Sequence, residues 1–346
     1  MNMGTESEQP DIEIEKAIRC CEQGGTLHSS DIDRVMSCVM AGQMSRDMLT
    51  RWLGAMALRI PTSQELLGCV SAFMRSAIRV PTATAPERIM DTCGTGGAHK
   101  VFNVSTLSAL VIATAGCPVA KHGNRSRTGF GSSETLAAMG LPIDSPPQTQ
   151  ARMLDERGFC FCLAPKHHQG AAHAVAVRKA LAVPTIFNVV GPLTNPAGAL
   201  RRVLGVWDKQ LLMPVAETLA GLGAVEAMVV HSVDGLDEIS VCAPTWFVHV
   251  KRGTIVDEGQ LRPEDFGVPQ HSELPVAAVG LPNAVEIAEG LLRGQQAGPR
   301  RDMLLVNSAV GFVMGGQQLS WKDAAAAARD LLDSRRVLTF FRSLVA

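Results

Sequence analysis

The sequence lacks an excess of charge of either sign, because 32 lysines and arginines stand against 33 aspartates and glutamates among its 346 residues. Nucleic acids and anionic membranes are bound by strongly basic faces, so a net charge of −1 favours neither partner. The sequence also lacks an apolar run long enough to cross a bilayer, since the longest, LSALVIATAGCPVA, is short and interrupted by hydroxyl groups. The acidic start MNMGTESEQPDIE is unlike a secretory or transit peptide, and we therefore expect a cytoplasmic protein.

The nine cysteines include no CxxC pair, and an odd number cannot all pair within one chain. Cys160 and Cys162, in GFCFCLAP, are expected to point to the same side of a strand as small buried thiols. Reduced core cysteines are therefore expected in place of disulfides or a metal site.

What is present is an ordinary globular composition with 46% hydrophobic residues, in a chain long enough for two domains or one large α/β unit. Residues 12–80 carry only helical patterns. Thr62 to Glu65 forms a capping box before one amphipathic stretch, and Ser30 is expected to cap an earlier one. We predict a small helical domain at 12–80, preceded by a flexible N-terminus at 1–11.

Beyond the proline-marked segment VPTATAPE, short apolar runs alternate with helical stretches. The expected strands include RIMDTC, PVAKHG, GFCFCLAP, RRVLGVW and EAMVVHS. This alternation predicts an α/β fold in which a mostly parallel sheet is flanked by helices. TWFVHVKRGTIV is expected to add a hairpin, and RRDMLLVNSAVGFVMGG and WKDAAAAARDLLDSRRVLTFF are expected to form two closing helices.

The glycine-rich stretch DTCGTGGAHKVFNVST, residues 91–106, falls between an expected strand and a helix expected to begin near Ser105. Glycine lacks a β-carbon and permits positive φ, so successive backbone N–H groups can line an anion site beside a helix N-terminus. The pattern therefore indicates phosphate. The Walker A and GxGxxG motifs both fail at His99, and a tight turn without ligand is a nearly equal alternative from the loop alone.

Polar side chains also follow two later strands. AKHGNRS places four hydrogen-bonding side chains after one strand, at Lys121, His122, Asn124 and Arg125. VVHSVDGLDEIS places three carboxylates after another, at Asp234, Asp237 and Glu238. The carboxylates form either a solvated turn or a Mg²⁺ site beside a polyphosphate.

The segment HAVAVRKALAVPTIFNVVGPLTNP carries Arg178 on a mostly apolar helix. This arginine either extends to the surface or, in a cleft, holds a carboxylate through two parallel hydrogen bonds. GPLTNP is expected to be a rigid loop suited to contact with a flat ligand.

Taken in order, the motifs GTGG…FNVST, KHGNR, AP…H…VR…TIFNVVGPLTNP and DGLDEIS resemble the anthranilate phosphoribosyltransferase family of tryptophan biosynthesis. The resemblance covers residues 12–346. It implies the phosphoribosyltransferase fold class shared with pyrimidine nucleoside phosphorylases. The small helical domain would be completed by about 168–190 and hinged to a large α/β domain at 84–166 and 197–346. The resemblance also implies a homodimer formed through the helical domain.

The function implied by this resemblance is Mg²⁺-dependent transfer of a phosphoribosyl group from phosphoribosyl pyrophosphate to the amine of anthranilate or a similar aromatic amine. The implied donor-binding residues are Gly94, Gly97, Asn103, Ser105, Thr106, Lys121 and Ser132. The implied acceptor-binding residues are Asn124, Arg178, His168 and Gly94. The implied Mg²⁺ ligands are Ser105, Asp237 and Glu238. No side chain is expected to act as nucleophile or base, because the amine attacks an oxocarbenium-like ribose and loses its proton afterwards.

Three segments depart from the family pattern. Ala98-His99 replaces the usual Asp-Gly, RTGF at 127–130 replaces paired serines, and the acceptor segment is rich in alanine. A diverged paralogue that acts on another aromatic amine or acid is therefore an alternative, as is a catalytically silent relative. Arg178 with GPLTNP argues against a nucleoside phosphorylase, and the net charge argues against a nucleic-acid-binding relative.

Overall fold

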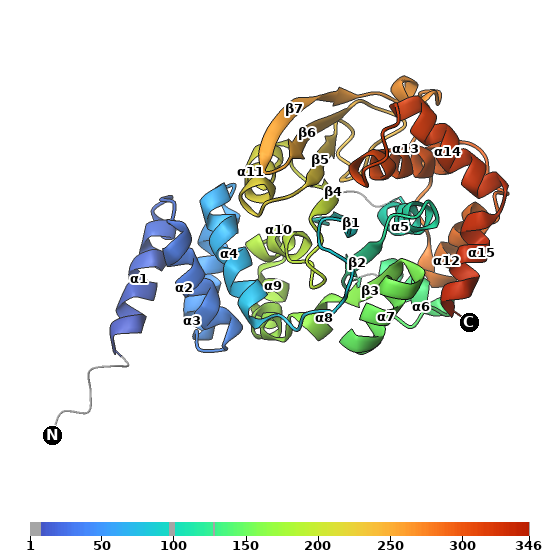
Figure 1. The fold of residues 1–346 in the computed structure, drawn as a ribbon. Coiled ribbons are helices and arrows are strands. Elements are labelled where there is room, and N and C mark those ends of the chain that lie inside the picture. Colours follow the sequence, from blue (N-terminus) through green and yellow to red (C-terminus); the bar gives the residue numbers. More distant parts are fainter. Residues whose placement is uncertain (1–7, 97–100, 127–128, 346) are drawn as a thin grey trace.

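The structure is a computed structural model that describes residues 8–96, 101–126 and 129–345. Its centre is a seven-stranded sheet in the order β3-β2-β1-β4-β5-β6-β7 (Figure 1). The strands are β1 Met90–Gly94, β2 Val119–Gly123, β3 Phe159–Leu163, β4 Arg201–Gly205, β5 Glu226–Ser232, β6 Thr245–Lys251 and β7 Thr254–Leu261.

The first five strands are parallel, and β6 and β7 continue the sheet as an antiparallel hairpin. The predicted fold class and the predicted hairpin are therefore confirmed. Because β1, β2, β4 and β5 are parallel neighbours, their carboxyl ends lie along one edge of the sheet. The register pairs Gly94 of β1 with Gly205 of β4 at this edge.

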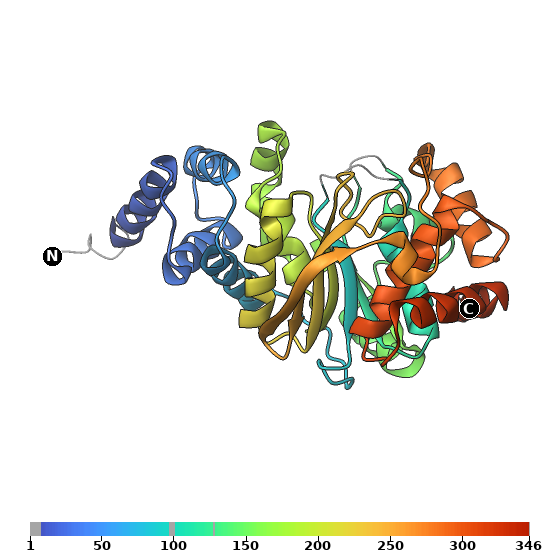
Figure 2. The same cartoon turned by 90° about the horizontal axis from the view of Figure 1, so that it is seen from above.

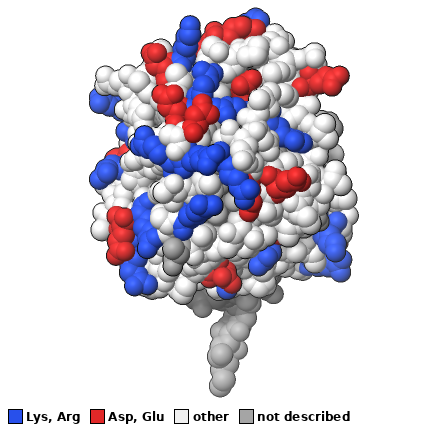
Figure 3. Space-filling view, turned by 90° about the vertical axis from the view of Figure 1, so that its right-hand side faces the viewer, with Lys and Arg blue, Asp and Glu red and all other residues white. Residues whose placement is uncertain are grey.

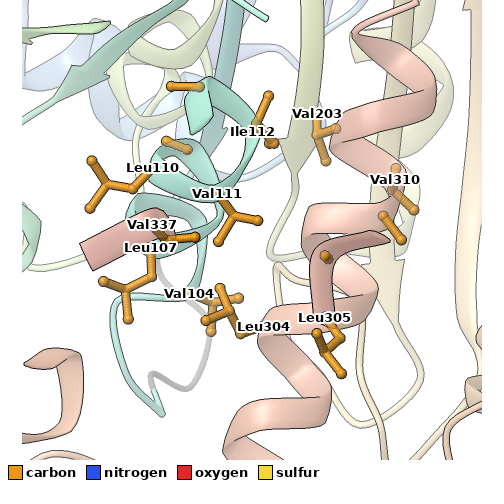
Figure 4. Packing of buried hydrophobic residues seen from close by; sticks show 14 of the residues in the cluster. Val104, Leu107, Leu110, Val111, Ile112, Val203, Leu304, Leu305, Val310 and Val337 are labelled. Carbon is orange, nitrogen blue, oxygen red and sulfur yellow. The ribbon is translucent and has the colours of Figure 1, made fainter. Parts of the chain in front are cut away.

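One face of the sheet is covered by α5 (Val104–Thr114), α13 (Pro299–Met314), α14 (Trp321–Asp333) and α15 (Arg336–Val345). Helix α5 is buried on nearly all sides, as expected of an apolar helix in the middle of a core. Ile112 of α5 packs beside Val203 of β4, and Val310 of α13 completes the contact (Figure 4). The second predicted closing helix is wrong in one respect, because it is divided into α14 and α15 at Arg335, whose φ is 60°. No glycine or proline marks that break.

The opposite face carries α10 (Ile186–Leu193), α11 (Leu212–Gly221) and the N-terminal helices. The latter are α1 (Glu8–Glu22), α2 (Ser29–Met40), α3 (Arg46–Ala57) and α4 (Ser63–Ser76). Figure 2 shows these helices on one side of the sheet and the C-terminal helices on the other. Trp52 of α3 and Phe73 of α4 belong to the same apolar cluster as Leu204 of β4, so the core runs from the helical part into the sheet.

Of the two helix caps predicted from sequence, one is confirmed and one is wrong. The Thr62–Glu65 capping box is confirmed, and Glu65 is fully buried in an ion pair with Arg59. The Ser30 cap is wrong, because α2 already begins at Ser29 and its capping residue is His28, whose ring Nδ1 accepts from the Ser30 N–H at 3.4 Å. A histidine ring is an uncommon cap, so the serine was the natural choice from sequence.

Short helices lie before and after β3 in the chain. Helix α7 (Pro147–Arg157) packs on β3, where Cys160 and Cys162 point to one side with their sulfur atoms 3.8 Å apart, as predicted. All nine cysteines are free thiols. After β3 follow the short helices α8 (Ala164–His167), η1 (Gln169–Ala174) and α9 (Val175–Leu181).

The face that carries the C-terminal helices shows basic and acidic side chains interspersed (Figure 3). On this part of the chain Arg293 pairs with Glu289 at 2.6 Å, and Arg301 pairs with Asp333. Within the described part of the chain, every helix is too short or too polar to traverse a lipid bilayer.

Candidate active site

The candidate site lies at the carboxyl edge of the parallel strands. The glycine-rich loop leaves β1 there, and the acidic loop at 233–238 leaves β5. The two loops meet, because the Gly96 N–H donates to Asp237 Oδ2 at 3.1 Å. Gly96 has a φ of +65°, which favours glycine, and an added β-carbon there would meet no atom within 4 Å. The backbone at Gly96 is therefore open toward the space above the sheet edge.

Two glycines allow the acidic loop to approach so closely. A β-carbon at Gly94 would lie 2.5 Å from Asp237 Oδ2, and one at Gly205 would lie 1.6 Å from the Asp237 carbonyl oxygen. The paired glycines at the ends of β1 and β4 thus form a floor on which Asp237 rests. Gly94 was predicted as a ligand-contacting residue, and here it has a packing reason of its own. Gly205 was missed, because its need appears only when β4 lies beside β1.

The N-terminus of α5 completes this part of the site. Glu238 Oε1 accepts from the Ser105 N–H at 3.3 Å, and the capping residue Asn103 makes no side-chain cap of its own. Instead Asn103 Nδ2 donates to Thr135 Oγ1 at 2.8 Å, which ties α5 to α6 (Ser132–Ala138). The predicted pair Asp237 and Glu238 is therefore brought to the backbone amides of the glycine loop and of the helix start.

Two other residues predicted to bind the phosphoribosyl donor lie in the first turns of α5 and α6. Ser132 begins α6, beside the loop that follows β2. Thr106 is buried in α5, and its hydroxyl has no hydrogen-bond partner among the described residues. Gly97 and the Ala98-His99 departure lie outside the described residues, as do the first two residues of RTGF.

Lys121 and His122 were expected after a strand, but both lie within β2 and are buried. Successive strand residues point to opposite faces, so the pair divides between the two faces of the sheet. The Lys121 ammonium turns toward β1 and donates to the Thr92 carbonyl, while the His122 ring lies 5.3 Å from the ring of His168. Asn124, beyond the strand, is exposed.

His168 lies on the opposite face from α5, between the sheet and the helical part. Its Nε2 is 2.9 Å from the Thr194 carbonyl oxygen, and its ring is 5.6 Å from that of Phe73. Burial lowers the pKa of His168 to about 4 and lowers the pKa of His122 well below its ordinary value. Both rings are therefore neutral near pH 7 and serve as hydrogen-bonding and packing groups.

Arg178 projects from α9 next to this aromatic cluster. Its guanidinium carbon lies 5.0 Å from the centroid of the Phe187 ring, and Nη2 donates to Asn188 Oδ1 at 3.4 Å. Stacking on Phe187 holds the planar guanidinium in one orientation, which suits capture of a planar carboxylate. Arg178 is half-buried, and its guanidinium lies over the Phe187 ring instead of extending into solvent.

GPLTNP is only partly the loop that was predicted. Its first three residues finish α10, because Val190 and Leu193 are buried and hold the helix past Pro192. Asn195 in its second half is buried, and its Nδ2 donates to Asp91 Oδ2 at 2.9 Å and to the Ala120 carbonyl at 2.8 Å. This buried amide joins the segment to β1 and β2.

Several polar residues that position the site were missed from sequence. Asp91 is fully buried and also accepts from the His122 N–H at 3.1 Å. Arg202, opposite Asp91 on β4, is buried and donates to the Pro192 carbonyl. Polar residues within otherwise apolar strands, as in RIMDTC and RRVLGVW, were the available signal.

The candidate metal ligands at this edge are the carboxylates of Asp237 and Glu238. Among the residues that the structure describes, no three His, Cys, Asp or Glu side chains gather as a metal site. Mg²⁺ commonly uses one or two protein carboxylates and takes its other ligands from water and phosphate. Asp237 and Glu238, beside the Ser105 backbone, fit that manner of binding and do not fit a site made entirely of protein ligands.

Comparison with known proteins gives consistent matches. A family model described as "Glycosyl transferase family, a/b domain" matches residues 86–336. Anthranilate phosphoribosyltransferase of Rubrobacter xylanophilus is 36% identical over 334 residues, which cover 96% of each chain. The crystal structure of the Thermus thermophilus enzyme of the same name is 34% identical, with a TM-score of 0.88 over 95% of this chain and 98% of that one. The Saccharomyces cerevisiae enzyme in complex with PRPP and Mg shares the fold, with a TM-score of 0.85 at 24% identity over 97% of each chain.

Proposed function

Because this chain belongs to the anthranilate phosphoribosyltransferase family of pentosyltransferases, we propose that it transfers a phosphoribosyl group from phosphoribosyl pyrophosphate to the amine of anthranilate in a Mg²⁺-dependent reaction. The proposal is supported above all by two hydrogen bonds between carboxylates and backbone amides at the sheet edge. Asp237 accepts from the Gly96 N–H, and Glu238 accepts from the Ser105 N–H. Amides at a glycine turn and a helix start bind phosphate, and carboxylates beside them are suited to a divalent cation.

The donor would lie over the carboxyl ends of β1 and β5. The backbone at Gly94 to Gly97 would receive the diphosphate, and the hydroxyl groups at the starts of α5 and α6 would bind phosphate oxygens. These hydroxyl and amide residues are Asn103, Ser105, Thr106 and Ser132. Asp237, Glu238 and Ser105 would hold Mg²⁺, which would offset negative charge as pyrophosphate departs. Lys121 would turn from the Thr92 carbonyl toward the same charge.

The acceptor would lie on the α10 side of the same edge. Arg178, stacked on Phe187, would hold the carboxylate of anthranilate, and the neutral ring of His168 would contact the aromatic amine. Asn124 and Gly94 would separate donor from acceptor. This arrangement directs the amine to the ribose carbon, which is an effect of orientation and requires no general base.

The assembly and location follow the same proposal. We expect a homodimer formed through the N-terminal helices, and a hinge between the helical part and the α/β part whose closure excludes water. Nine free thiols suit the reducing cytoplasm.

The test is release of pyrophosphate from phosphoribosyl pyrophosphate with Mg²⁺ and a panel of arylamines, anthranilate first. We expect release with anthranilate that depends on Mg²⁺. Release only with another aromatic amine or acid would identify a diverged paralogue, to which the alanine-rich acceptor segment points. A folded protein that binds the donor and releases nothing with any acceptor would be a silent relative.

A further inference from the structure

One side chain joins the two halves of the candidate site. Asn188, in the first turn of α10, has its amide nitrogen 3.5 Å from the Thr95 carbonyl oxygen. Its side-chain oxygen accepts from Arg178 Nη2 at 3.4 Å and from the Thr185 N–H at 3.1 Å. A single amide group thus contacts the arginine on one side and the glycine-rich loop on the other.

The contact on the loop falls on a critical peptide group. The Thr95 carbonyl and the Gly96 N–H belong to the same peptide plane, because they are joined by one amide bond. Asn188 holds the carbonyl end of this plane, and Asp237 holds the N–H end at 3.1 Å. Gly96, with φ at +65°, is free of β-carbon constraints, so the plane needs outside contacts to fix its direction.

The rest of Thr95 is held firmly. Its N–H donates to the Gly205 carbonyl at 2.9 Å, its hydroxyl accepts from the Trp207 N–H at 3.1 Å, and the residue is buried. The loop is therefore anchored up to Thr95, and the peptide that follows is the first one able to turn. Asn188 acts at that point.

We propose that Asn188 is a positioning residue that couples the carboxylate-binding arginine to the phosphate-binding loop, an inference that rests on the proposed function. Through its oxygen it holds the Arg178 guanidinium, and through its nitrogen it fixes the peptide plane that presents the Gly96 N–H to Asp237. The two ends of one amide serve two subsites, so a change of one atom alters both contacts.

Asn188→Asp makes that one-atom change. The aspartate keeps an oxygen for Arg178 and for the Thr185 N–H, but it places a second oxygen against the Thr95 carbonyl, which repels it. We expect affinity for pyrophosphate with Mg²⁺ to fall about tenfold, the effect of one hydrogen bond exchanged for repulsion. Affinity for anthranilate is expected to fall at least about tenfold as well, because the new carboxylate pairs with Arg178 and competes with the carboxylate of anthranilate. Asn188→Leu removes both contacts, and both affinities are expected to fall.

Calorimetric titration of each probe separately, on wild type and variants, measures both affinities. Thr185→Ala is the matched control. It removes the 3.5 Å contact of the Thr185 hydroxyl with Asn188 Oδ1, but the Thr185 N–H and the contacts of Asn188 with Arg178 and Thr95 remain. We expect it to lower the melting temperature and to leave both affinities within about twofold of wild type, because the lost cap acts on stability alone.

Wild-type affinity for pyrophosphate in Asn188→Leu or Asn188→Asp would overturn the inference, because the loop would then be held without Asn188. A loss of both affinities in Thr185→Ala would also overturn it, because the effect would then come from the start of α10 in general. The failure of the proposed function is distinguishable, because the wild-type protein itself would then take up neither pyrophosphate nor anthranilate, and the inference would fall with it.

Discussion

The two halves of the candidate site are held by different kinds of chemical group. The sheet-edge half, formed by Gly96, Ser105, Asp237 and Glu238, presents backbone amides whose positions follow from strand register and a helix start. The helix half, formed by His168, Arg178, Phe187 and Asn188, presents side chains held by one another. The sheet-edge half is suited to phosphate, which many enzymes bind. The helix half is suited to the proposed acceptor, which differs from one enzyme to another.

The two halves also differ in backbone strain. The sheet-edge half uses glycine at the position with positive φ, where it costs little. The helix half ends α9 with Ala182 in the left-handed region, at φ 55° and ψ 17°. An alanine there is held by its surroundings, since nothing in its own chemistry favours that conformation.

The largest expected effect on turnover comes from substitutions in the sheet-edge half. Asp237→Asn with Glu238→Gln is expected to reduce turnover at least about a thousandfold, because charge on the leaving group is no longer offset. Steady-state assays at saturating Mg²⁺ measure it, and circular dichroism checks the fold. Asp234→Asn is the control, since this carboxylate contacts Ser240 in the same loop and neither of the two amides. Near wild-type turnover in the double variant would remove the metal assignment.

The next largest effect, on the KM for the acceptor, comes from a substitution in the helix half. Arg178→Ala is expected to raise the KM for anthranilate about a hundredfold through loss of a charge-assisted pair, with donor affinity intact. Kinetics at saturating donor measure the acceptor KM, and Lys179→Ala, an exposed neighbour on the same helix, is the control. An unchanged acceptor KM in Arg178→Ala would place the carboxylate contact elsewhere.

A packing substitution tests the glycine floor. Gly205→Ala would set a β-carbon 1.6 Å from the Asp237 carbonyl oxygen. Either the fold loses about 3 kcal/mol or the acidic loop shifts and turnover falls, because backbone cannot yield as a flexible side chain does. Gly54→Ala is the control, because its added β-carbon, in α3, meets nothing within 4 Å and is expected to stabilise by about 1 kcal/mol. Urea unfolding compares the two, and a neutral Gly205→Ala would contradict the close packing.

The smallest expected effect sharpens the comparison of strain. Ala182→Gly is expected to stabilise the protein by up to about 1 kcal/mol, because glycine adopts the left-handed conformation without the β-carbon clash. The urea midpoint measures it. Destabilisation on this change would mean that the conformation at the end of α9 carries no strain.

The residues of the sheet-edge half were largely named from sequence, whereas in the helix half Arg178 and His168 were named and Phe187 and Asn188 were not. Three glycines before Asn-Val-Ser-Thr mark a strand–helix junction by local chemistry alone, and the alternating pattern places the acidic loop at the same edge. Gly205 and Asn188 were missed from sequence. Gly205 is required only because the loop after β5 packs against it, and Asn188 only because it contacts Arg178 of α9 and Thr95 after β1. Such requirements arise between segments far apart in sequence. The division of Lys121 and His122 between two faces of the sheet follows from β2 running on to Gly123, which places both residues within the strand.

The central claim is that one cleft at this sheet edge takes up an activated ribose together with a divalent ion. Calorimetric titration of folded protein with phosphoribosyl pyrophosphate, with and without Mg²⁺, tests it most directly. We predict saturable uptake that strengthens when Mg²⁺ is present and is lost in the Asp237→Asn, Glu238→Gln double variant. No uptake by the wild-type protein under either condition would contradict the account.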